Sequence, residues 1–270
     1  MSLRAAVPQA SGSPPLEGGR SADGRVGVDL QPPMQRTRGE GRIEAQHLDG
    51  RTRLRTLFQD GAARIRLPHT HDASLQAALI NTAGGLCDGD RLAWEAAAGP
   101  GARLVLTTPA CERVYRALGE GAACLATRLS AAAGARIDWL PQETILFAGS
   151  RLERTLEVDL AADATFLAVE AVILGREAMG ETALDARLED RWRIRRDGRL
   201  LHAEATRLTG TALERDGIAL LGGASALATI LYVGADAERR LSAVGDLLHG
   251  RSGASVIGER LVIRAVASGG

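Results

Sequence analysis

Residues 81–116, NTAGGLCDGDRLAWEAAAGPGARLVLTTPACERVYR, combine glycine-rich turns with two short apolar segments. The glycines of its first part allow backbone angles that other residues resist, and Asn81 beside them predicts an Asx-turn. Residues 91–98 then predict a strand, Gly99-Pro100-Gly101 predicts the turn of a hairpin, and residues 102–108 predict the returning strand. The segment therefore indicates a fold built from short strands.

Most of the remaining chain repeats this pattern. Residues 152–160 alternate between apolar and polar positions, which predicts a half-buried strand. Asp197-Gly198 between two such runs predicts a hairpin. Helices are predicted over residues 213–221 and 236–249, the second with an apolar stripe on one face. Further strands are predicted at residues 42–48, 51–56, 62–67, 74–80, 122–130, 136–140, 144–148, 165–174, 190–196, 199–207, 226–233 and 259–266. The chain is therefore predicted to be mainly β, with short strands in a sandwich, a barrel or a stacked β structure and about two helices.

The N-terminal segment differs from the rest. Residues 1–40 are rich in Pro, Gly, Ser and Arg and show no hydrophobic periodicity, so they predict a disordered leader. A single β-rich domain is predicted over residues 41–270.

Composition excludes some classes of partner. The 33 basic residues balance the 33 acidic ones, which gives no reason to expect nucleic acid or an anionic membrane as a partner. Three cysteines in a chain of 270 residues are not a disulfide framework, and a reducing cytosol is the simplest compartment. The sequence has neither a signal-peptide core nor an apolar run of the ~20 residues that a membrane helix needs.

Three sequence blocks resemble the urease accessory protein UreD family. In the first, the family pattern N-x-x-G-G-x-x-x-G-D-R-L, then G-P-G-A, then T-T-x-A-x-x-x-x-Y-R, is matched from Asn81 to Arg116. The second is WLPQETILF, residues 139–147, and the third is EAVILGREAMGE, residues 170–181. The blocks occur in the family's order and cover about half of the chain, so their combination is specific.

The resemblance implies a fold and a function. It implies stacked sheets that follow a roughly β-helical path. It implies a cytoplasmic urease maturation factor, without enzymatic activity, that forms a complex with UreF and the GTP-hydrolysing UreG. That complex would dock on the urease apoprotein and let nickel reach its active site. Nickel would be cargo in transit, with no tightly bound cofactor.

Glu170 is the main candidate for a nickel path. It is the only charged residue in the apolar run 165–174, and a buried carboxylate is costly unless it is paired or hydrated. One hypothesis is a structural ion pair with an arginine, and the other is a water-lined interior path for nickel. Glu143, Glu181 and Asp90 are further candidates for that path.

Two other classes of function remain open from the residues. A metal-dependent hydrolase would use Asp88, Asp90, His69 and His71, provided that these groups converge in a pocket. The simpler interpretation is that His69 and His71 lie in an exposed loop and that the aspartates stabilise a turn. A β-rich binding scaffold without any metal is the third class.

Overall fold

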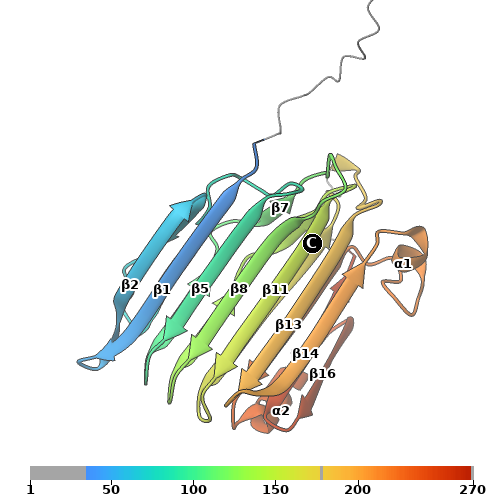
Figure 1. Ribbon diagram of the computed structural model, residues 1–270. Helices are drawn as coiled ribbons and strands as arrows, with labels where there is room; N and C mark the ends of the chain where they lie inside the picture. Colours follow the sequence, from blue (N-terminus) through green and yellow to red (C-terminus); the bar gives the residue numbers. More distant parts are fainter. Residues whose placement is uncertain (1–34, 177–178, 269–270) are drawn as a thin grey trace, which may run out of the picture. The chain divides into compact units, whose positions relative to one another are not determined.

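The computed structural model describes residues 35–176 and 179–268, which form two β-sheets packed face to face (Figure 1). Sheet A has seven strands in the order β14 (Arg199–Leu208), β13 (Arg187–Arg196), β11 (Arg151–Leu160), β8 (Ala123–Ala131), β5 (Arg91–Ala98), β1 (Arg38–Leu48) and β2 (Arg51–Gly61). Sheet B has the order β16 (Arg251–Ile257), β17 (Arg260–Ala267), β15 (Ala226–Val233), β12 (Thr165–Leu174), β9 (Arg136–Leu140), β6 (Arg103–Thr107), β4 (Leu75–Asn81) and β3 (Ala63–Arg66). The short strands β7 (Glu112–Val114) and β10 (Thr144–Leu146) extend sheet B at one side.

The middle of the chain passes repeatedly from one sheet to the other. Strands β5, β8 and β11 lie parallel in sheet A, and each is followed by β6, β9 or β12 in sheet B, again parallel. The result resembles a β-solenoid, which confirms the expected mainly β fold of stacked strands. The predicted hairpin at residues 99–101 is wrong, because β5 and β6 belong to different sheets. Gly101, with φ of 68°, instead lies in the turn between the two sheets. Its N–H donates to the carbonyl of Ala133, which lies in the next such turn.

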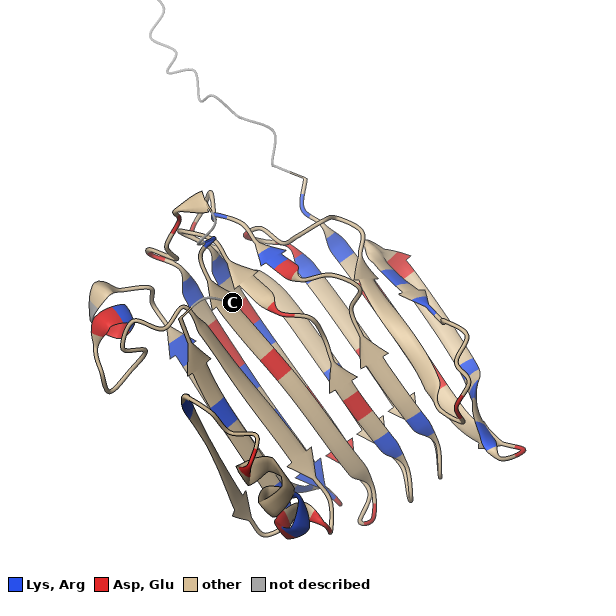
Figure 2. Ribbon diagram, turned by 180° about the vertical axis from the view of Figure 1, so that it is seen from behind, with Lys and Arg blue, Asp and Glu red and all other residues tan. Residues whose placement is uncertain are grey.

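The inner faces of the two sheets make the core. Alternate residues of each strand point inward, and on β11 the inward row is Leu152, Arg154, Leu156, Val158 and Leu160. Buried Ala, Leu, Val and Ile dominate, together with the three tryptophans of the chain. Acidic and basic positions are spread over many strands, and neither sign covers a whole face (Figure 2). Because the inner faces are mostly apolar, the buried charge of Arg154 on β11 is an exception to the composition of the core.

Several local predictions are confirmed. β13 and β14 form the predicted hairpin, with positive φ at both Asp197 and Gly198. Helices α1 (Ala212–Asp216) and α2 (Ala237–Gly245) lie where helices were expected, but both are shorter. β7 and β16 were not predicted.

The predicted leader is only partly within the described chain. Residues 1–34 lie outside it. The predicted domain boundary at Gly41 falls inside β1, which begins at Arg38. Just before that strand, Arg36 pairs with Asp88 at 2.9 Å and the Thr37 N–H donates to Asp90 at 2.7 Å. In the described chain, no helix is long and apolar enough to cross a membrane.

Candidate functional site

The three sequence blocks come together at one end of the sheets, where the chain returns from sheet B to sheet A. Leu86 bridges to Val114 of β7, β7 pairs in parallel with β10, and β10 pairs in parallel with the end of β12. In that register Thr144 lies beside Glu112 on one side and Val172 on the other. Segments from three separate parts of the sequence therefore line one region of the inter-sheet space.

A buried ion network lies next to this region. Glu170 of β12 and Asp190 of β13 are each 7% exposed, and Arg154 of β11 lies between them at 4%. Arg154 donates to Glu170, and its second amino group donates to Asp190 at 2.7 Å. The indole N–H of Trp139 donates to the other oxygen of Glu170 at 2.7 Å. When all three groups are ionised, the network carries a net charge of minus one.

The network has unused hydrogen-bonding capacity. Within the network, Oδ1 of Asp190 and Nε of Arg154 are buried without a hydrogen-bond partner among the described residues. Burial raises the pKa of Glu170, because the desolvation of its charge outweighs the attraction of Arg154. Burial opposes the charge of Arg154, but the two carboxylates outweigh it and raise its pKa. Buried polar atoms of this kind are normally satisfied by ordered water, so the surroundings are suited to bound water.

Glu112, the first residue of β7, is a half-buried carboxylate of the same region. The side-chain amide of Asn81 donates to its two oxygens at 3.1 and 3.3 Å. Burial raises the pKa of Glu112 to about 7, so the side chain is about half protonated at neutral pH. Asn81 also makes the predicted Asx-turn, accepting the Ala83 N–H at 3.0 Å. The sole asparagine of the chain thus joins the glycine turn to Glu112.

Two adjacent cavities lie between Glu112 and the ion network. An outer hollow of about 160 Å³ is lined by residues that include Asn81, Gly85 and Cys111. An inner cavity of about 30 Å³ is lined by residues that include Arg154 and Glu170, and it has room for about one water molecule. Both are bordered by Trp94, Thr108 and Glu112. Glu112 therefore stands between the outer hollow and the buried network.

Comparison with known proteins identifies the family. The family model described as "UreD urease accessory protein" matches residues 37–270. The chain belongs to the UreD family of urease accessory proteins. It is 58% identical over 240 residues to a urease accessory protein UreD of Chelativorans, with 88% of this chain and 86% of the relative covered. It is 55% identical over 238 residues to the urease accessory protein UreD of Rhizobium etli, with 87% of each chain covered. It is 48% identical over 245 residues to that of Agrobacterium fabrum, with 90% and 86% covered. An accessory role toward urease is the function that this membership carries.

The other predicted path residues lie apart from the inner cavity. Asp90 is buried and accepts backbone N–H groups from Thr37 and Cys87, each at 2.7 Å. Glu181 accepts the Ala148 N–H at 2.7 Å and pairs with Arg176, and this bonding lowers the pKa of Glu181. Glu143 is half-buried, and its main-chain carbonyl accepts the Glu112 N–H at 2.9 Å. Among the predicted path residues, Glu170 is the one that lines the inner cavity.

The residues of the hydrolase alternative do not form one site. His69 and His71 are exposed in the loop before β4. Asp88 is buried and accepts from Arg36 and from the Leu118 N–H at 3.0 Å, as expected of a turn aspartate. Over residues 35–176 and 179–268, no three His, Cys, Asp or Glu side chains converge closely enough to hold a metal ion.

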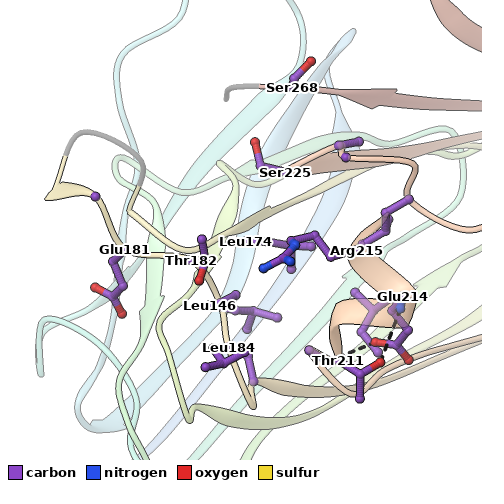
Figure 3. Close-up of a pocket in the computed structure, with 18 residues that line it drawn as sticks. Leu146, Leu174, Glu181, Thr182, Leu184, Thr211, Glu214, Arg215, Ser225 and Ser268 are labelled. Atoms are coloured by element: carbon purple, nitrogen blue, oxygen red, sulfur yellow. Dashed lines mark hydrogen bonds between the residues drawn. The ribbon is translucent and has the colours of Figure 1, made fainter. Parts of the chain in front are cut away.

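A larger pocket of about 320 Å³ lies near the third block (Figure 3). Its lining is mostly apolar and includes Leu146, Leu174 and Leu184. Arg215 of α1 also borders it, as does Glu181. The inner cavity, although smaller, is the one that contains the buried carboxylate of the third block.

Proposed function

We propose that the chain is a urease maturation factor that acts as a non-catalytic cytoplasmic scaffold in a complex with UreF and UreG. The complex assists the GTP-dependent insertion of nickel into the urease apoprotein. Membership in the UreD family supports the accessory role. The observation that carries the nickel part is the placement of two carboxylates, the half-buried Glu112 and the buried Glu170, along two adjacent cavities.

The charge of the interior favours a cation. When Glu170 and Asp190 are both ionised, Arg154 balances one of them, which leaves one negative charge in surroundings that solvate it poorly. An uncompensated buried charge costs several kcal/mol, so a cation passing beside Glu170 relieves this cost. Glu112 exchanges its proton near neutral pH, so it accepts a cation at the entrance by releasing that proton.

The chemistry of these ligands suits release. Ni²⁺ is held most tightly by imidazole and thiolate groups, whereas carboxylates together with water hold it more loosely. A carrier of cargo needs the looser kind of site. Glu143 and Glu181 remain secondary members of the proposed path, because Glu143 contacts Glu112 through its carbonyl and Glu181 borders the larger pocket. Asp90 is given no contact with nickel, since both of its oxygens already accept backbone N–H groups.

Co-purification tests the proposed assembly. The tagged chain is expressed with UreF, UreG and the urease subunits, and the eluate is analysed by mass spectrometry and for nickel. The proposal predicts that all three partners are recovered, and that urease made without this chain contains little nickel. Urease that fills with nickel to the same extent, and at the same rate, in cells lacking the chain would contradict the proposed function.

A further inference from the structure

The outer edge of sheet A at β2 is unusually open. β2 is the outermost strand (Figure 1) and has 11 residues, of which Thr52 alone is buried. The other edge strands of the two sheets are β3 with 4 residues, β16 with 7 and β14 with 10. β2 contains no proline, so each of its residues keeps the main-chain N–H that strand pairing uses.

Pairing on this edge already begins at one point. The N–H of Thr52 donates at 2.8 Å to the carbonyl of Ala73, in the loop before β4. Beyond that point, the open side of residues 53–61 has no main-chain partner among the described residues. A strand added here would continue an interaction that the loop starts.

The inward side of β2 is apolar and incompletely covered. Leu54 lies opposite Ala45 and Leu57 lies opposite Ile43, and both of those β1 residues belong to the core. A β-bulge opposite Glu44 and Ala45 lets Leu54 and Leu57 point to the same inward face, yet they are 36% and 38% exposed. Strand β3 is too short to cover them. Aliphatic side chains from an added strand would complete this end of the core.

The outward side of β2 is basic over its first half, whereas Phe58 and Asp60 lie on the same side toward its end. Arg51, Arg53 and Arg55 are exposed, and the one acid pair that they make is a distant one, Arg55 with Glu44 at 3.8 Å. Farther into sheet A, outward arginines do meet acids on the next strand. Arg128 contacts Glu95 at 3.3 Å and Glu157 at 3.5 Å, and Arg42 contacts Glu95 at 3.2 Å. The arginines of β2 have no next strand, so their complementary acids have to come from a partner.

We propose that β2 is a docking edge for an extended segment of a partner protein, with acidic residues beside Arg53 and Arg55 and aliphatic residues facing inward. The segment adds a strand to sheet A by main-chain pairing along residues 53–61. A second copy of this chain is not the favoured occupant, because antiparallel pairing of two β2 edges over residues 53–61 would set Arg53 opposite Gly61 and Arg55 opposite Gln59, and neither residue is acidic. The inference does not rest on the proposed nickel path.

A synthetic peptide tests this proposal with the full chain. A fluorescent peptide of about nine residues, alternating Glu and Val, matches the length of the open edge. Its binding is measured by anisotropy, and the protected backbone is located by hydrogen–deuterium exchange. We expect binding with protection of residues 53–61, and much weaker binding of a Lys–Val peptide of equal length. N-methylating alternate residues separates pairing from charge, because a bound strand uses one of its edges. One N-methylated isomer should bind and the other should not.

Two variants localise the interaction. The double variant Arg53→Glu with Arg55→Glu should weaken binding of the Glu–Val peptide by about tenfold or more, because two attractive charge contacts become repulsive. The matched control, Arg199→Glu with Arg207→Glu, reverses two exposed arginines on β14 at the opposite edge of sheet A and should leave binding unchanged. Circular dichroism melting shows that both variants fold. Equal binding of the Lys–Val peptide, protection confined to β14 or β16, or self-association through β2 in light scattering would each overturn the proposal.

Discussion

Replacing Glu112 by Gln should make the protein more stable at alkaline pH. The side chain is half-buried beside Asn81, and its pKa in the fold is about 7 against an ordinary value of 4.5. A carboxyl group whose pKa is raised by folding does not oppose folding below about pH 4.5, and its cost grows as the pH rises through 7. The difference of about 2.5 units corresponds to about 3 kcal/mol once the group is fully ionised. Glutamine keeps the shape and an amide oxygen for Asn81, but it does not ionise.

The assay compares urea unfolding of the wild type and Glu112→Gln between about pH 5 and pH 8. The two free energies of unfolding should lie close together at the acidic end. They should diverge as the pH rises, with the variant about 3 kcal/mol more stable at about pH 8. Glu153→Gln, at an exposed position of β11, controls for the loss of a carboxylate elsewhere. If the difference between wild type and Glu112→Gln is the same at every pH, the burial argument for Glu112 is wrong.

Two further predictions concern the ion network and the start of the fold. Arg154→Met should destabilise the fold by about 3–5 kcal/mol, because it leaves two buried carboxylates without a cation. Acidification should restore part of the lost stability by protonating those carboxylates. An unchanged melting temperature would refute this prediction. A chain that begins at Gln35 should have the same free energy of unfolding as the full-length protein. A chain that begins at Gly41 should be about 2–4 kcal/mol less stable, because it lacks the contacts of Arg36 and Thr37. Equal stability of the two truncated chains would contradict the role assigned to those contacts.

Local patterns in the sequence predict the strands but not which strands pair. Alternation of apolar and polar residues gives the position of β11, and Asp197-Gly198 specifies a tight hairpin. The Gly99-Pro100-Gly101 turn is compatible with a hairpin and with a connection between two sheets. Turn residues determine the local bend of the chain but not which strand the next segment pairs with. β7 has three residues, too few for a periodic signal.

The ion network was partly visible in the sequence. Glu170 stands out as the charged residue of an apolar strand. Arg154 and Asp190 each occupy an inward position between apolar residues, so the same reasoning would have found them. Their pairing depends on the register between β11, β12 and β13, which is set by the whole solenoid. Glu112 gave no such signal, because its burial comes from loops that meet only in three dimensions.

The nickel content of urease tests most directly the claim that Glu112 and Glu170 line a path for nickel. Urease is matured in cells that carry Glu112→Gln, Glu170→Gln or the exposed control Glu153→Gln, and its nickel per active site is measured by elemental analysis. Melting of the complex and co-purification of UreF are measured on the same samples. We predict little nickel with Glu112→Gln and Glu170→Gln, normal nickel with Glu153→Gln, and an intact complex in all three. Loss of nickel with Glu112→Gln, a variant that we expect to be at least as stable as the wild type, would separate transport from folding. Full nickel loading by both cavity variants in an intact complex would contradict the proposed path.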